Sequence, residues 1–210
     1  MGHTVRFNSG ARLAVAWWIL VAVTLHSPPC GWTQTYTIDR HHSTVSFEIR
    51  HFFARLEGAF RGFEGTIEHV PGESAQWAVD ATIRVASIHT KHPPRDEHLL
   101  SGEFFDEETF PAITFKSSGV EDAGEGNYRL KGLLTMHGVE KPVKLDMKYL
   151  GTDQDPWGND RARFTATGVL KRSDFGIDWN VAWKNGAWLL SEEVVVKLDI
   201  QALPVIEVQG

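Results

Sequence analysis

The stretch "YRLKGLLTMHGVEKPVKLDMKY" (residues 128–149) alternates apolar with polar residues on both sides of a short connection. Before the connection, positions 128, 130, 132, 134 and 136 form one face, and most residues between them are charged or carry a hydroxyl group. After it, positions 143, 145, 147 and 149 repeat the pattern against lysine and aspartate. A period of two residues is typical of a half-buried β-strand. The connection "HGVEKP" (137–142) has turn residues, so the stretch predicts two antiparallel neighbours.

The same alternation occurs in six further segments, which brings the number of predicted strands to eight. Because most connections are short, we expect sequential strands to be antiparallel neighbours. Eight such strands can close into an all-β, up-and-down antiparallel barrel, which removes the exposed edges of an open sheet. A two-sheet sandwich is the alternative. The six further segments are residues 44–51, 63–68, 79–85, 113–116, 163–170 and 193–200.

The predicted interior combines large apolar residues with small ones. An eight-stranded barrel is just wide enough either to be filled by side chains or to hold one small ligand. Small inward residues leave room for a cavity, although glycines in strands also mark bulges. Both interpretations stay open for Gly65, Ala81, Gly132, Ala166 and Gly168.

The segment "SIHTKHPPRDEHLLSGEFFD" (87–106) is rich in histidine and carboxylate, which raises the question of a metal site. Its spacings do not place three or four ligands on one regular face, because Pro93 and Pro94 separate His92 from Asp96. Proline is favoured at the first turn of a helix, so we expect a short helix that begins at the prolines and ends near Gly102. This helix lies between the third and fourth predicted strands, where it could cap a barrel mouth. Its apolar side consists of Leu99, Leu100 and Phe104.

The N-terminus is typical of an exported protein. Arg6 and Arg12 precede the apolar run Leu13–Leu25, which is shorter than the roughly 20 residues of a membrane span and is typical of a secretory signal peptide. We therefore predict a signal peptide over residues 1–33, with an uncertain cleavage site, and one domain over residues 34–210, located in the periplasm or secreted. Cys30 is the only cysteine, so the domain depends on its core rather than on a disulfide.

Charge and motifs argue against several classes of function. The net charge of −6 makes nucleic acid an unfavourable partner. The sequence has no GxSxG motif and no Gly-rich phosphate loop, so it contains no recognisable signature of an enzyme. The tryptophan-rich segment "NVAWKNGAWLLSEE" (180–193) is either core or an apolar patch that contacts a membrane or a partner.

Four blocks of sequence resemble the YceI-like lipid/polyisoprenoid-binding family, in order and nearly throughout residues 36–200. They are "YTIDRHHSTVSFEIRH" (36–51), "RDEHLLSGEFFDEETFPAITFKS" (95–117), "LKGLLTMHGVEKPVKLDM" (130–147) and "KRSDFGIDW" (171–179). The resemblance implies a lipocalin-like, extended eight-stranded barrel with a helix in one connection. It also implies an exported protein that holds an isoprenoid or fatty-acyl lipid in an interior tunnel.

The resemblance and the inward register together predict the ligand site. Candidates for the lipid tunnel are Phe47, Ile49, Phe63, Ile67, Ile83, Val85, Leu99, Leu100, Phe104, Phe115, Leu134, Met136, Leu145, Met147, Phe164 and Leu170. His51 ends an apolar strand on the inward face and is the first candidate to contact the lipid head group, although a satisfied core histidine is the alternative. Further head-group candidates are Arg95, Asp96, His98 and Arg172; Arg95 and Asp96 could instead form only a surface pair.

The predicted function is the sequestration or transport of an amphiphilic lipid, without catalysis, cofactor or bound metal. Two other functions remain as alternatives: a stress-related or interaction protein with a filled barrel, and a metal protein or enzyme that uses the histidine-rich segment. Transient membrane contact and a homodimer are left open, as are the chain length and head group of the lipid.

Overall fold

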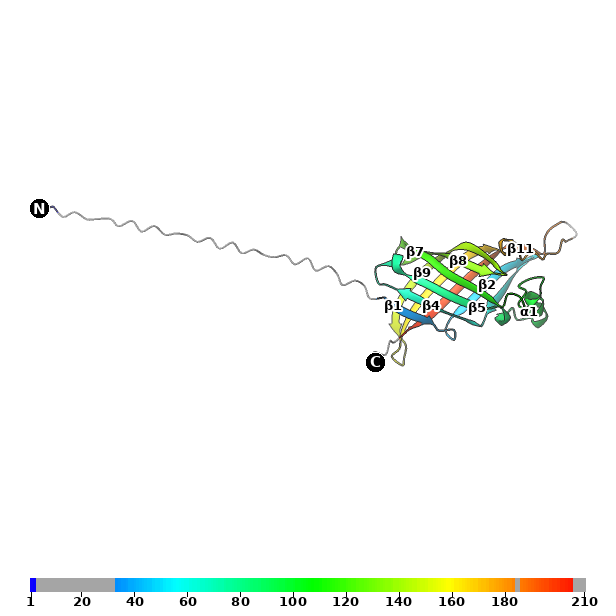
Figure 1. Ribbon diagram of the computed structural model, residues 1–210, viewed down its shortest axis with the longest axis horizontal. Helices are drawn as coiled ribbons and strands as arrows, with labels where there is room; N and C mark the ends of the chain where they lie inside the picture. The colour runs from blue at the N-terminus through cyan, green and yellow to red at the C-terminus, as the bar shows by residue number, and fades with distance from the viewer. Residues whose placement is uncertain (3–32, 184–185, 206–210) are drawn as a thin grey trace.

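Among the residues that the computed structural model describes (1–2, 33–183 and 186–205), eleven β-strands pair into one antiparallel sheet, and one α-helix lies at its end (Figure 1). None of the helices in this part of the chain is both long and apolar enough to cross a membrane. The predicted signal peptide falls almost entirely on residues outside the described ranges. The strands are β1 (Gln34–Ile38), β2 (Thr44–His51), β3 (Ala54–Phe60), β4 (Phe63–His69), β5 (Ala78–Arg84), β6 (Ile88–His89), β7 (Ala112–Gly124), β8 (Asn127–Met136), β9 (Val139–Gln154), β10 (Asp160–Lys171) and β11 (Leu190–Pro204).

The eleven β-strands occupy the eight strand positions of a closed barrel, because three of these positions are each divided into two shorter strands. We call each of the eight positions a stave. β1 and β2 together form the first stave, since both pair with β11. β4 and β3 form the second, since they pair with β1 and β2 respectively. β5 and β6 form the third, and β7 to β11 follow as sequential antiparallel neighbours. The predicted eight-stranded, up-and-down barrel is therefore confirmed, and the pairing of β1 with β11 closes it and excludes the open sandwich.

The first two staves are longer than the sequence pattern indicated. The predicted first strand, 44–51, covers only β2, and the predicted second strand, 63–68, covers only β4. The missed pieces, β1 and β3, lie beyond interruptions at residues 39–43 and 61–62, where the alternation loses its phase. The β1–β4 pairing ends at Thr37 and Thr66, and the β2–β3 pairing begins at Val45 and Phe60. Between these pairs, the first stave has seven residues (38–44) and the second has only five (61–65). The first stave therefore bulges at this point.

The predicted helix is confirmed as α1 (Pro93–Leu100), in the connection between the third and fourth staves. His92 lies outside it as the N-cap residue, and its Nδ1 accepts a hydrogen bond from the backbone N–H of Arg95 at 3.2 Å. The backbone N–H of Ser101 bonds to the carbonyl of His98 and ends the helix. A two-turn helix is marginal alone, so α1 depends on docking at the barrel end where Figure 1 shows it.

Inward glycines accept large side chains of neighbouring strands. A Cβ atom at Gly132 would collide with the ring of Phe115, and one at Gly168 would collide with Leu145. The glycines therefore do not simply leave empty volume, as one of the two interpretations of the sequence had it. They let large side chains lie along the barrel wall rather than across its interior. The same relation holds between Gly58 and Phe47.

The end of the barrel opposite α1 is closed by aromatic residues. Trp77 is buried and donates a hydrogen bond from Nε1 to the carbonyl of Val70 at 2.7 Å. The imidazole of His69 lies 4.4 Å from the ring of Trp77 and 4.7 Å from that of Tyr149, measured between centroids. Burial lowers the pKa of His69, so the neutral imidazole is favoured here. These packed rings close this end of the barrel, which we call the floor of the cavity.

Arg161 ties the interruption of the first stave to the connection between β9 and β10. Its NH1 donates to Asp39 at 2.6 Å, and its Nε donates to Asp155 at 3.0 Å. Burial acts to raise the pKa of Asp39, but hydrogen bonds from Arg161, His42 and the backbone of His41 outweigh it and lower the pKa to about 2. The Arg161 clamp thus stabilises the barrel with Asp39 ionised.

Substitution Gly65→Ala should destabilise the barrel, because a Cβ atom there would press on the backbone carbonyl of Asp80 and the Cα atom of Ala81. Backbone atoms cannot rotate away, so we expect a loss of about 1–3 kcal/mol in the free energy of unfolding. Gly119→Ala is the matched control, since a Cβ atom there meets nothing within 4 Å. Urea unfolding of both variants measures the difference; equal stabilities would contradict the close approach.

Substitution Arg161→Gln should lower the melting temperature by about 3–8 °C at pH 7, and this deficit should shrink in acid. The folded-state pKa of Asp39 is about 2, below the roughly 3.9 of an unfolded chain, so its contribution is present above about pH 4 and is lost as the pH falls toward 2. Melting curves of both proteins at pH 7 and pH 2.5 measure this. A deficit of the same size at both pH values would show that the clamp does not act through Asp39.

Candidate functional site

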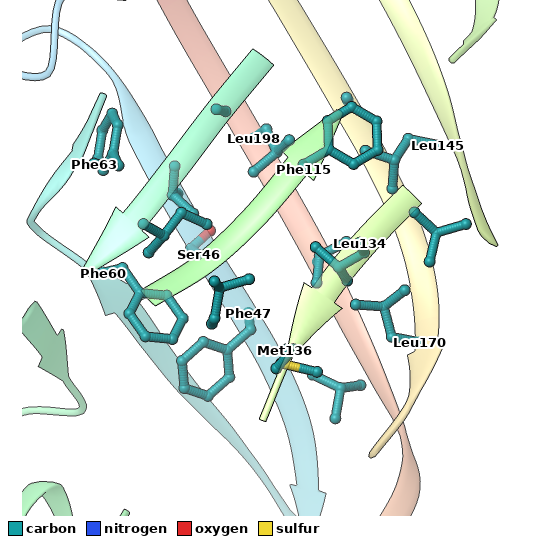
Figure 2. Close-up of a pocket in the computed structure, with 18 of the residues that line it drawn as sticks. Ser46, Phe47, Phe60, Phe63, Phe115, Leu134, Met136, Leu145, Leu170 and Leu198 are labelled. Atoms are coloured by element: carbon teal, nitrogen blue, oxygen red, sulfur yellow. The ribbon is translucent and has the colours of Figure 1, made fainter. Parts of the chain in front are cut away.

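The interior of the barrel contains a cavity of about 360 Å³. Figure 2 shows side chains from several strands around it, with Phe47, Phe115 and Leu134 among them and almost no polar atoms. Its wall extends from Trp77 and Phe164, at the closed floor, to α1 at the other end. An apolar and elongated space of this kind suits a hydrocarbon chain rather than a polar substrate.

The structure places most of the sixteen tunnel candidates in the wall of this cavity. The exceptions are Val85, which is fully buried in the surrounding core, and Leu100, which packs against that core from α1. Most candidates were chosen as alternate residues of a strand, and alternate residues of every strand in a closed barrel face the same interior. This explains why the predicted residues line the cavity. The candidates in the wall are Phe47, Ile49, Phe63, Ile67, Ile83, Leu99, Phe104, Phe115, Leu134, Met136, Leu145, Met147, Phe164 and Leu170.

Several wall residues were missed because they lie on segments that the sequence pattern did not assign to strands. Ile38 belongs to β1, and Leu56 and Phe60 belong to β3. Ile177 and Trp179 come from the irregular segment after the short 3₁₀ helix Arg172–Phe175. The tryptophan in "GIDWN" (176–180) was the available signal, since an aromatic residue in an irregular segment needs somewhere to pack.

The helix and the 177–179 segment meet over the end of the cavity. The ring of Trp179 lies 5.0 Å from that of Phe104 and 5.0 Å from the imidazole of His98, and the rings of His98 and Phe104 are 4.9 Å apart. All three residues also contact the cavity. These three residues form the mouth of the cavity. None of them belongs to a β-strand, so contacts between their rings hold the mouth together.

Arg95 and Asp96 are both bound to Thr90. Arg95 donates from Nε to the hydroxyl of Thr90 at 2.7 Å and from NH2 to its carbonyl at 2.7 Å. Asp96 accepts from the backbone N–H of Thr90 at 2.8 Å and lies 3.5 Å from Nδ1 of His89. Burial acts to raise the pKa of Asp96, but the hydrogen bonds from Thr90 outweigh it and lower the pKa. Arg95 reaches the cavity wall, whereas Asp96 does not.

Arg172 is a buried cation at the mouth. Its guanidinium donates to the carbonyls of Ser191, Ile177 and Trp179 at 3.1, 2.9 and 2.7 Å, and to Glu192 at 3.0 Å. These bonds fix the 177–179 segment against β11. Arg172 contacts the cavity, but most of its N–H groups already have partners.

The two remaining head-group candidates, His98 and His51, differ in their hydrogen bonding. Nε2 of His98 lies 2.6 Å from Oε2 of Glu103, so this ring has a polar partner. His51, at the end of β2, also contacts the cavity, and no hydrogen bond joins its imidazole to the described part of the chain. The sequence placed His51 correctly on the inward face but could not show that its ring makes no hydrogen bond to the described residues.

The histidine-rich segment is not arranged as a metal site. His89, His92 and His98 each have a different neighbour: Asp96, the helix N-terminus and Glu103. Nowhere in the described ranges do three or more histidine, cysteine, aspartate or glutamate side chains gather closely enough to hold a metal ion.

Both the sequence and the fold of this chain are similar to those of known proteins. The chain is similar to a UPF0312 protein of Vibrio cholerae serotype O1, with 34% identity over 160 residues that cover 75% of this chain and 85% of the relative. A UPF0312 protein of Pectobacterium atrosepticum is 41% identical over 145 residues, which cover 68% of this chain and 75% of that relative. Among solved structures, Burkholderia cenocepacia BcnA matches with a TM-score of 0.70 and 26% identity, over 78% of this chain and 98% of that chain.

A polyisoprenoid binding domain from Saccharophagus degradans shares the fold, with a TM-score of 0.57 and 15% identity over 81% of this chain and 98% of that chain. The YceI-like domain matches residues 36–202, from β1 almost to the end of β11. The match therefore includes every stave of the barrel, α1 and the cavity. The chain belongs to the YceI-like domain family.

Proposed function

We propose that this protein binds one long-chain amphiphilic lipid inside the barrel and carries it through an aqueous compartment, without catalysis. The observation that carries the proposal is the apolar cavity that runs from the aromatic floor to the mouth at α1. The Saccharophagus degradans domain of the same fold is described as a polyisoprenoid binding domain, and this supports the choice of ligand class. The signal-like sequence of residues 1–33 supports a periplasmic or secreted location.

The length of the cavity favours a chain longer than an ordinary membrane acyl chain. On β11, wall residues run from Leu190 to Ile200, ten residue steps that extend over about 34 Å of strand. A strand tilt of about 40° leaves roughly 25 Å along the barrel axis. The hydrocarbon core of a bilayer is about 30 Å for two leaflets, so one ordinary chain needs about 15 Å. An extended polyisoprenoid or a very long acyl chain uses the cavity more fully.

Burial of the chain supplies the affinity. Each methylene transferred from water contributes about 0.8 kcal/mol, from which the costs of ordering the ligand are subtracted. The polar groups at the mouth are few, and hydrogen bonds within the protein already engage Arg95, Nε2 of His98 and most N–H groups of Arg172. His51 is therefore the residue that we assign to the head group. One imidazole can exchange one hydrogen bond with a hydroxyl or a carboxylate.

The alternative, an interaction protein with a filled barrel, makes the opposite prediction about the interior. Side chains would then have to occupy the space that the structure leaves open beside Phe47, Phe115 and Leu134. Organic extraction of protein purified from its native compartment, followed by mass spectrometry, distinguishes the two. Recovery of a long-chain lipid in about one-to-one ratio supports the carrier.

Substitution Leu134→Trp should block the cavity. Leu134 is buried in the wall, whereas its neighbour Leu133 points outward and is exposed, so Leu133→Trp is the matched control. We expect the inward indole to weaken the binding of geranylgeraniol at least tenfold, a loss of about 1.4 kcal/mol or more, because it occupies the space of the chain. Titration of both variants and of the unmodified protein measures this, and melting curves verify folding. Full binding by a folded Leu134→Trp protein would exclude this cavity as the site.

Substitution His51→Leu should weaken only ligands that have a polar head. Loss of one hydrogen bond costs about 0.5–1.5 kcal/mol, which corresponds to a decrease of about 2- to 12-fold in the affinity for geranylgeraniol. The hydrocarbon of the same chain without the hydroxyl group is the control ligand, and its affinity should not fall. Parallel titrations of the two ligands measure the difference. Equal losses for both would mean that His51 shapes the wall rather than contacts the head group.

A further inference from the structure

Four apolar side chains are exposed on the β2–β3 turn and on the segment before β11, both beside the mouth of the barrel. We call them the aromatic rim: Phe53, Val181, Trp183 and Trp188, which are 89%, 43%, 48% and 58% exposed. Single exposed apolar residues are normal on protein surfaces. Here, however, four of them, three with large rings, lie on two segments that a backbone hydrogen bond from Phe52 to Leu189 joins, with Trp188 paired to Ala182 across the second segment. The tryptophan-rich segment left open by the sequence therefore contributes a surface patch rather than core packing at these positions.

Backbone hydrogen bonds and ring contacts hold the aromatic rim in place. The N–H of Leu189 donates to the carbonyl of Val181 at 2.9 Å, and the N–H of Trp183 donates to that of Ala187 at 2.7 Å. The N–H of Phe52 donates to the carbonyl of Leu189 at 2.7 Å, which joins this segment to the turn between β2 and β3. The ring of Phe52 lies 5.3 Å from that of Trp183. These hydrogen bonds and the ring contact thus fix the backbone that carries the exposed rings.

The turn between β2 and β3 places phenylalanine against local conformational preference. His51 pairs with Ala54, so the turn consists of only Phe52 and Phe53. Phe52 has a φ of 57°, in the left-handed region, where a hairpin turn favours glycine or asparagine. A backbone cost of this kind is typical of functional positions. Phe53, the second residue of this turn, is 89% exposed and contributes little to the core.

The aromatic rim is continuous with the cavity. Phe52 follows His51 directly, and Leu189 follows Trp188; both His51 and Leu189 belong to the cavity wall. In Figure 1, the segment that precedes β11, drawn in orange-brown, extends past the strand ends at the same end of the barrel as α1. A surface that contacts the aromatic rim therefore lies next to the mouth.

We propose that the aromatic rim docks the protein on the surface of a lipid bilayer, so that the ligand passes between bilayer and cavity at the mouth. The inference rests on the proposed function, because a long-chain lipid is stored in a membrane. Tryptophan and other amphipathic rings favour the membrane–water interface. The net charge of −6 makes electrostatic attraction to anionic lipid a poor source of affinity, so insertion of the apolar rings must supply it.

A second copy of the chain fits the aromatic rim less well. The three aromatic side chains have about 150–250 Å² each, so their exposed fractions amount to roughly 400 Å². A standard protein interface buries about 800 Å² on each partner. The aromatic rim is thus about half the size that a stable dimer needs, whereas shallow insertion into a bilayer has no such requirement.

Flotation with phosphatidylcholine vesicles tests the docking. The double variant Phe53→Ser with Trp188→Ser removes two rings that do not belong to the cavity wall. Trp157→Ser is the matched control, because Trp157 is 80% exposed but lies in the β9–β10 connection at the opposite end of the barrel. We expect the double variant to lose vesicle binding at least tenfold and the control to retain it, with little effect of salt. All forms should bind geranylgeraniol in solution equally.

The other outcomes separate the two proposals. If the unmodified protein binds geranylgeraniol but not vesicles, or if the double variant floats as the unmodified protein does, the docking proposal is wrong and the proposed function stands. If no form binds geranylgeraniol, the proposed function fails, and flotation still decides whether the aromatic rim binds a bilayer. A dimer of the unmodified protein that the double variant converts to a monomer, measured by light scattering, would instead identify the aromatic rim as an interface between copies.

Discussion

The barrel depends on the hydrogen bonds that β11 makes along both of its edges. One edge pairs with β10 over ten residue pairs, and the other pairs with β2 and then with β1. Without the second set, the molecule would be an open sheet with two exposed edges and one broad apolar face. With it, the inward residues of every stave face one another across a closed space. The Arg161 clamp on Asp39 stabilises the first stave where its pairing is interrupted.

Closure alone does not produce a cavity, because eight staves are few enough for side chains to fill the interior. The distribution of glycine explains why they do not fill it. Phe115 lies over Gly132, and Phe47 lies over Gly58, each on a neighbouring strand. Rings that rest on the wall in this way leave the axis open, whereas a side chain at the glycine would push them inward. The large apolar residues thus line the space instead of occupying it.

The sequence was sufficient for those features that depend on the period of two and on proline. Alternation predicted the eight staves and the inward face of each, and Pro93 with Pro94 predicted the start of α1. The alternation gave no reliable signal for β1 and β3, because interruptions at residues 39–43 and 61–62 separate these short strands from the longer pattern. Ile177 and Trp179 were also missed, since irregular backbone has no period that shows which side chains turn inward.

The choice of partner by each polar side chain was beyond the reach of the sequence. Arg95, Asp96, His98 and Arg172 were all reasonable candidates for a head group, and the first three lie on the helix that was expected to cap a barrel mouth. Their actual hydrogen bonds go to Thr90, Glu103 and the carbonyls of residues 177, 179 and 191, and only the folded geometry shows this.

These contacts divide the mouth into a structural and a free part. Arg172 fixes the 177–179 segment against β11, and the bonds of Arg95 and Asp96 to Thr90 fix the start of α1, so the walls of the opening are held by charges that would cost free energy if left unpaired. His51 has no such task among the described residues, and it lies directly before the turn that presents Phe53. A ligand that enters beside this turn would meet His51 first and the apolar wall beyond it. Polar contact at the opening and apolar contact along the wall thus depend on different residues.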